Sequence, residues 1–89
     1  MAQVLVVDDS GTVRNEVCEF LKSNGLTVTP AVDGKDGLEK LKADPAIKLV
    51  VSDVNMPNMD GVALIRALRA LPQYRATPIL MLTTEFADS

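Results

Sequence analysis

The chain has 89 residues, 47% of them hydrophobic, with 12 acidic and 9 basic side chains and a formal net charge of −3. This length suits one small domain and excludes two independent cores, and an acidic chain without a basic face is a poor candidate for binding nucleic acid. No apolar run approaches the roughly 20 residues of a membrane span. There is no histidine and one cysteine, Cys18, which excludes histidine metal sites and internal disulfides and favours a reducing, cytoplasmic setting.

The first predicted unit is a strand followed by a helix. Residues 3–7 form a continuous apolar run, which is typical of a strand buried on both faces. Ser10 or Asp9 can cap the following helix because a short side-chain oxygen accepts from the first helical N–H groups. Gly25 is suited to end that helix. Its expected inward face consists of Val13, Val17, Phe20 and Leu21.

The second predicted unit repeats this order. Residues 26–32 are expected to form a strand, and Pro30, which cannot donate to a strand ladder, assigns it to a sheet edge. A turn at Asp33-Gly34 precedes a short helix that Asp44-Pro45 ends. The apolar face of this helix is formed by Leu38 and Leu41.

The third unit ends in another acidic residue. Residues 47–52 are predicted as a buried strand that runs into Asp53, with a loop over residues 54–61. The following helix is stopped by Pro72, and Pro78 opens a fourth strand over residues 79–82. The inward face of the helix is expected to be Val62, Ile65 and Leu68, with Leu64 and Leu71 as further candidates.

Alternating strands and helices predict an α/β domain with a parallel sheet and helices on both faces. In such sheets, ligands bind beyond the carboxyl ends of the strands. Asp8 and Asp9 follow the first strand, Asp53 the third and Thr83 the fourth. We therefore expect three carboxylates and one hydroxyl to meet at one edge of the sheet.

Oxygen ligands without cysteine or histidine favour a hard cation, and Mg²⁺ is preferred over Ca²⁺ because few protein oxygens are present. The hypothesis is that Asp9 and Asp53 bind Mg²⁺ directly, that the backbone carbonyl of Asn55 supplies a third oxygen, and that Asp8 acts partly through water. Aspartate is also a nucleophile that forms aspartyl-phosphate. Asp53 is thus the candidate phosphoryl acceptor, and Thr83 could donate to the phosphoryl group and act as a switch.

Three segments of the chain carry a family resemblance. VVDDS at residues 6–10, VSDVNMPNMDG at residues 51–61 and MLTT at residues 81–84 resemble a bacterial response-regulator receiver domain, most closely the chemotaxis type. The resemblance implies a flavodoxin-like fold with strand order 2-1-3-4. It also implies that Asp53 accepts phosphate from the phosphohistidine of a histidine kinase and that the domain is not a turnover enzyme.

By the same resemblance, Asp8 and Asp9 are the acidic metal pair, the Asn55 carbonyl completes the Mg²⁺ site, and Thr83 is the switch hydroxyl. A full receiver continues through a further helix, a strand that carries a lysine, and a last helix. Residues 1–89 are therefore predicted to be one receiver domain, truncated after the fourth strand. We expect the uncovered sheet face and edge to make it a homo-oligomer, most simply a two-fold dimer through the fourth strand, with domain swapping as one route.

Other protein classes fit these residues less well. A phosphate-binding nucleotide enzyme needs a glycine-rich loop after the first strand, where this chain has two acids. A flavin-binding protein fails for the same reason and for lack of aromatic residues, and an aspartyl phosphatase would carry an acid at Asn55. The remaining alternative is a truncated fragment that self-associates without phosphoryl transfer. Taken singly, Asp8 and Asp9 could be helix caps, Cys18 is a small buried side chain and Arg14 belongs to a solvated helix face.

Overall fold

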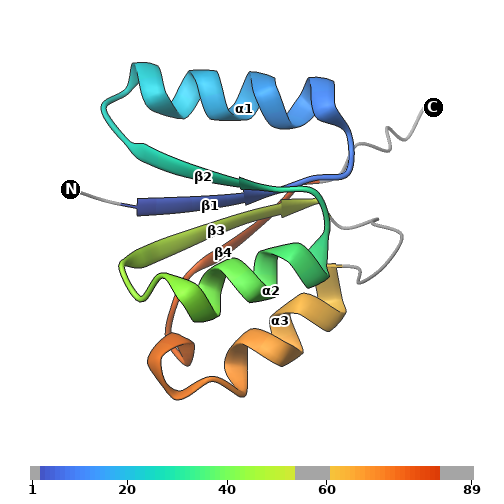
Figure 1. Cartoon of the computed structure of the whole chain (residues 1–89), viewed down its shortest axis with the longest axis vertical. Helices are drawn as coiled ribbons and strands as arrows, with labels where there is room; N and C mark the ends of the chain where they lie inside the picture. Colours follow the sequence, from blue (N-terminus) through green and yellow to red (C-terminus); the bar gives the residue numbers. More distant parts are fainter. Residues whose placement is uncertain (1–2, 54–60, 83–89) are drawn as a thin grey trace.

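Four parallel strands form one sheet in the order β2-β1-β3-β4 (Figure 1). The computed structural model describes residues 3–53 and 61–82. The elements along the chain are β1 (Gln3–Val7), α1 (Gly11–Ser23), β2 (Thr27–Ala31), α2 (Gly34–Ala43), β3 (Ile47–Asp53), α3 (Gly61–Arg69), the 3₁₀ turn η1 (Pro72–Tyr74) and β4 (Ile79–Leu82). The predicted flavodoxin-like α/β fold and strand order are confirmed, and β2, which contains Pro30, lies at an edge.

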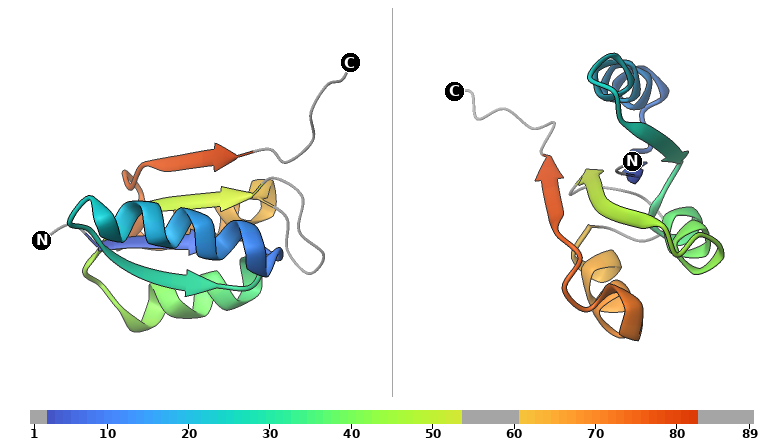
Figure 2. Two further views of the ribbon diagram at one scale, coloured as in Figure 1. Left: turned by 90° about the horizontal axis from the view of Figure 1, so that it is seen from above. Right: turned by 90° about the vertical axis from the view of Figure 1, so that its left-hand side faces the viewer.

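Helix α1 covers one face of the sheet, and α2 and α3 cover the other (Figures 1 and 2). Alternate residues of β1 pack against the two helix layers, because successive side chains of a strand point to opposite faces. Val4 and Val6 pack with Cys18 of α1, whereas Leu5 and Val7 pack with residues of α2 and α3. This two-sided burial explains why the strand is apolar throughout.

Helix α1 begins and ends as its sequence predicts. The Ser10 side chain caps it by accepting from the amide of Val13 at 3.3 Å. At the other end Gly25 has a φ of +85°, and the amides of Gly25 and Leu26 donate to the carbonyls of Lys22 and Leu21. These paired hydrogen bonds form a Schellman motif, which favours glycine at this position.

The inward face of α1 was predicted incorrectly at one position. Cys18 is buried, and Val17 and Leu21 pack against the same cluster, but Phe20 is 65% exposed. Neighbouring residues on an α-helix are about 100° apart around the axis. Phe20 therefore lies beside the apolar stripe centred on Leu21 rather than within it.

Helix α2 begins at Gly34, a residue predicted from the sequence to lie in the preceding turn. Asp33 is the cap, accepting from the Asp36 amide at 2.8 Å, so Gly34 is helical and the predicted turn at Asp33-Gly34 is wrong. Gly37 is buried in the same helix. A Cβ atom there would lie 3.0 Å from Cγ2 of Val7, so the glycine allows α2 to approach β1 closely.

Helix α3 buries Leu64 and Leu68, whereas Ile65 is half-buried and Val62 is 51% exposed. The prediction that Val62 faces inward is therefore wrong: the buried stripe runs through Leu64 and Leu68, one helical turn apart. Pro72 begins η1 rather than directly ending the helix. Neither described helix of this layer, nor α1, is long and apolar enough to cross a membrane.

Tyr74 joins η1 to the end of α2. It is 1% exposed, and its hydroxyl shares its one proton between the carbonyl oxygens of Leu41 at 2.7 Å and Asp44 at 2.6 Å. The Arg69 guanidinium donates to the carbonyls of Tyr74 and Thr77 at 2.9 and 2.7 Å. These contacts hold in place the segment that connects α3 to β4.

Candidate acidic metal and phosphoryl site

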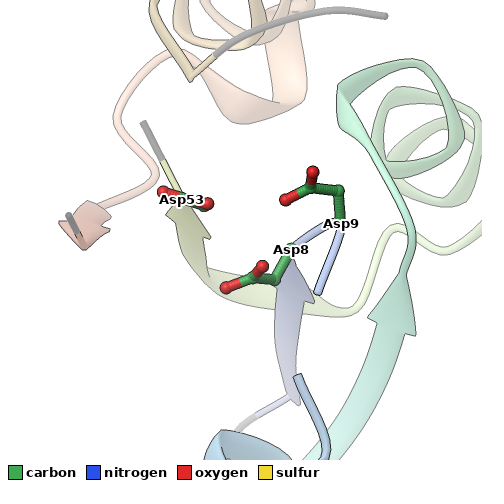
Figure 3. Close-up of side chains that lie close together, drawn as sticks. All are labelled: Asp8, Asp9 and Asp53. Atoms are coloured by element: carbon green, nitrogen blue, oxygen red, sulfur yellow. The ribbon is translucent and has the colours of Figure 1, made fainter. Parts of the chain in front are cut away.

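Three aspartates from two strands converge at the carboxyl edge of the sheet (Figure 3). Asp8 and Asp9 directly follow β1, and Asp53 is the last residue of β3. Each offers one carboxylate oxygen, and the three oxygens lie within 4.8 Å of one another. Asp8 and Asp53 are each 2% exposed, whereas Asp9 is exposed to solvent. The predicted convergence of these three side chains is confirmed.

Asp8 is held by hydrogen bonds to three different parts of the chain. Its amide donates to the Ala31 carbonyl at 3.1 Å, which continues the β1–β2 ladder. Its carboxylate accepts from the Ser10 amide at 2.8 Å. Its own carbonyl accepts from Nη1 of Arg14 at 2.7 Å. The orientation of this residue is therefore fixed before any ligand binds.

Asp53 is positioned by the two neighbours of β3. The strand pairs with β1 on one side, where Ser52 stands opposite Val7, and with β4 on the other, where Asp53 stands opposite Leu82. The Ser52 hydroxyl donates to the Asp53 carbonyl at 3.0 Å. Because both flanking strands are parallel to β3, the Asp53 carboxylate emerges at the edge where β1 also ends.

Electrostatics at this site favour a bound cation. Burial raises the pKa of the Asp8 carboxyl above its ordinary value. The nearby carboxylates of Asp53 and Asp9 raise it further, and the Ser10 amide and the Arg14 charge oppose this rise. A divalent cation among the three carboxylates would cancel the repulsion between them.

The donor set fits a hard divalent cation. All three groups are carboxylates, the ligands that Mg²⁺ and Ca²⁺ prefer, and the exposed position of Asp9 leaves the site open to water on one side. Two further predicted site residues, Asn55 and Thr83, lie outside the described residues.

Comparison with known proteins identifies the family. Residues 4–89 match the response regulator receiver domain. This chain is a receiver domain. It is 39% identical over 84 residues to the chemotaxis protein CheY1 of Helicobacter pylori strain J99, an alignment that covers 93% of this chain and 68% of the relative.

Solved structures agree with this assignment. The structure of chemotaxis protein CheY4 of Vibrio cholerae superimposes on this receiver domain with a TM-score of 0.91 and 45% sequence identity, covering 98% of this chain and 72% of the other. A receiver protein from Pseudomonas putida gives a TM-score of 0.88 at 29% identity, covering 96% and 69% of the two chains. The sequence prediction of a response-regulator receiver of the chemotaxis type is therefore confirmed at the level of the family.

Sequence reasoning missed one residue of the receiver site. Arg14 was interpreted as part of a solvated helix face, but its side chain turns back to the Asp8 carbonyl. One signal was present in the sequence: a cation close to a helix N-terminus opposes the helix dipole, which makes a compensating contact worth looking for.

Proposed function

We propose that this receiver domain accepts a phosphoryl group on Asp53 from the phosphohistidine of a histidine kinase, in the cytoplasm and with Mg²⁺. The observation that carries the proposal is the convergence of the Asp8, Asp9 and Asp53 carboxylates within 4.8 Å at the carboxyl ends of β1 and β3. Receiver domains are signalling modules, and we propose that Asp53 is modified once per signal rather than turning over a substrate. The chemotaxis names of its relatives support an output of that kind.

In the proposed reaction, a carboxylate oxygen of Asp53 attacks phosphorus. The P–N bond to the donor histidine breaks, its electron pair stays on the imidazole, and a new P–O bond joins the phosphoryl group to Asp53. Mg²⁺, when bound, shields the phosphoryl oxygens from the surrounding carboxylates. Asp8, fixed by Ser10 and Arg14, holds negative charge beside Asp53 in a constant place, so the site is organised in advance.

The remaining site residues are proposed on the same basis. Asp9 and Asp53 would bind Mg²⁺ directly, the Asn55 carbonyl would add a third oxygen, and Asp8 would act partly through water. Thr83 would donate to the phosphoryl group and move when it does so. The pairing of Asp53 with Leu82, the residue before Thr83, supports this role.

The test is phosphorylation by acetyl phosphate with Mg²⁺, followed by intact-mass measurement. We expect the wild type to gain the mass of one phosphoryl group and Asp53→Asn to gain none. Glu39→Gln, which removes an exposed acid from α2, is the matched control and should behave as the wild type. A folded wild type that gains no mass, or an Asp53→Asn variant that does, contradicts the proposal.

A second candidate function is self-association of the 89-residue chain without phosphoryl transfer. It is favoured by exposed apolar side chains on the α1 side of the sheet. Leu80 of β4 is 54% exposed and pairs with Val51, whose side chain packs under α1. Phe20 of α1 is 65% exposed, and β4 lies at an edge of the described sheet. A two-fold dimer would bury this surface.

A further inference from the structure

Arg14 lies close to the start of α1, which begins at Gly11, and no acidic residue occupies the first turn of this helix. The N-terminus of a helix carries partial positive charge and therefore disfavours a cation. Arg14 does not extend into solvent away from this charge. Its Nη1 atom donates to the carbonyl of Asp8 at 2.7 Å, so the residue turns back toward the end of β1.

The guanidinium of Arg14 lies close to Gly11, the first residue of the helix. A Cβ atom built on Gly11 would lie 3.7 Å from Nη2 of Arg14, so the planar group lies over the first residue of the helix. Arginine suits this position because its planar group presents several donors in a fixed geometry, whereas lysine carries a point charge on a flexible chain.

The Asp8 carbonyl that Arg14 contacts belongs to the peptide group linking Asp8 to Asp9. On one side of that peptide, the Asp8 amide is tied to Ala31 of β2, and the Asp8 carboxylate is tied to the Ser10 amide. The Arg14 contact therefore fixes the orientation of the one peptide plane from which the two acids diverge. Asp8 lies on the buried side of the site and Asp9 on its exposed side, and a carboxylate oxygen of each lies within 4.8 Å of one of Asp53.

We propose that Arg14 is a positioning residue of the acidic site, which holds the Asp8–Asp9 peptide so that both carboxylates face Asp53. The inference rests on the proposed Mg²⁺ function of that site. Arg14 has two opposing effects on the affinity of the site for a cation. As a nearby positive charge, Arg14 weakens the attraction of the site for a cation, whereas as a positioning group it strengthens binding. We infer that positioning is the larger effect.

The test compares Arg14→Met, which keeps the apolar stem and removes the donor and the charge, with Arg14→Lys, which keeps the charge. Lys22→Met, which removes an exposed cation from the last turn of the same helix, is the matched control. Mg²⁺ dissociation constants are measured by calorimetry, and hydrogen exchange of the Ser10 amide reports the Asp8 contact without any metal.

We expect Arg14→Met to bind Mg²⁺ about 10-fold more weakly than the wild type, since groups that orient metal ligands commonly contribute that much to affinity. Arg14→Lys should recover part of the loss, and Lys22→Met should bind as the wild type does. The Ser10 amide should exchange faster in Arg14→Met than in Lys22→Met.

Equal or tighter Mg²⁺ binding by Arg14→Met overturns the inference, because it assigns Arg14 a repulsive or purely structural effect. If the wild type itself binds no Mg²⁺, the proposed metal site fails, and the exchange of the Ser10 amide then decides the positioning role alone. Unchanged protection of that amide in Arg14→Met would also refute it. If Arg14→Met does not fold, Arg14→Leu, which also lacks a donor and a charge, takes its place in both measurements.

Discussion

At the scale of single residues, the acidic site concentrates like charge where water is scarce. Asp8 and Asp53 are almost fully buried, and their carboxylate oxygens lie within 4.8 Å of each other and of Asp9. At Asp8 this arrangement opposes folding when no cation is present, because burial and the nearby carboxylates both disfavour its ionised form and raise its pKa. The charge that lowers stability at Asp8 is the same charge that the proposed Mg²⁺ site needs.

Asp8→Asn is expected to stabilise the fold when no divalent cation is present. The pKa of Asp8 in the folded chain is raised above its ordinary value of 3.8, so the folded state binds this proton more tightly than the unfolded state does. The contribution of Asp8 to stability is thus fully present below pH 3.8 and is lost as pH rises through the folded pKa. Without divalent cations at neutral pH, we expect Asp8→Asn to be more stable than the wild type by about 0.5–2 kcal/mol.

Urea unfolding followed by circular dichroism measures this difference, and the gain should disappear at a pH below 3.8. The asparagine oxygen can still accept from the Ser10 amide, so the fold is preserved. Asp9→Asn, at an exposed position, is the control and should gain less. A wild type that is as stable as Asp8→Asn at neutral pH would count against the electrostatic account.

Prediction at the residue scale succeeded where an acid directly follows a buried strand. Asp8, Asp9 and Asp53 could be assigned to one edge because parallel strands bring their carboxyl ends together. The contacts of Arg14 and Ser10 with Asp8 could not be predicted, because a hydrogen bond between a side chain and a backbone group leaves no periodic pattern in the sequence. Orientation within α1 and α3 was also missed at Phe20 and Val62, since either residue fits a broad apolar stripe.

At the scale of elements, the connection from α3 to β4 depends on Tyr74. No sequence pattern marked this residue as part of the core, yet it is 1% exposed and its hydroxyl donates to two carbonyls at the end of α2. The last carbonyls of a helix have no partner within the helix. Tyr74 therefore caps α2 from another element, and it links two segments 33 residues apart in the chain.

We predict that Tyr74→Phe lowers the free energy of unfolding by about 1–3 kcal/mol, because the ring still fits while the Leu41 carbonyl loses the tyrosine hydroxyl and the Asp44 carbonyl keeps only the longer hydrogen bond from the Ile47 amide at 3.4 Å. Burial raises the pKa of the Tyr74 hydroxyl above its ordinary value of 10.0. The stabilising effect of the hydroxyl is therefore present below pH 10.0 and is lost as pH rises through the folded pKa.

Thermal or urea unfolding of Tyr74→Phe at neutral and alkaline pH checks both parts of this prediction. The deficit of the variant should shrink as pH rises above 10.0. A variant as stable as the wild type at neutral pH would show that water replaces the tyrosine hydroxyl at these carbonyls.

At the scale of the whole molecule, the two faces of the sheet are covered unequally. Among the described residues, helices α2 and α3 pack side by side over one face, whereas α1 is the one helix over the other (Figure 1). The layered α/β architecture was predictable because strands, helix caps and breakers recur in a regular order along the chain, whereas the strand order 2-1-3-4 was implied by the resemblance to receiver domains and not by this pattern. The exposure of Leu80 on the α1 side follows from the same topology, with β4 at the far edge from β2.

We predict that Leu80→Lys weakens self-association of the 89-residue chain at micromolar concentration, because a charge would then occupy the proposed contact surface. Val62→Lys is the matched control: Val62 is 51% exposed, close to the 54% of Leu80, but lies on α3 at the opposite face. Sedimentation equilibrium distinguishes the two. A monomeric wild type, or an equal effect of both substitutions, contradicts a dimer through the α1 side of the sheet.

The position of Tyr74 has a spectroscopic consequence. It is the only tyrosine in a chain without tryptophan, so it dominates the near-ultraviolet absorption and the intrinsic fluorescence. It lies in η1, before β4 begins, whereas the aspartates lie at or just beyond the carboxyl ends of β1 and β3, so this chromophore stands at the opposite end of the sheet from the acidic site. Its emission therefore reports the integrity of the α2–η1 junction. If adding Mg²⁺ releases heat while the tyrosine emission stays unchanged, the cation binds and the fold at this junction stays intact.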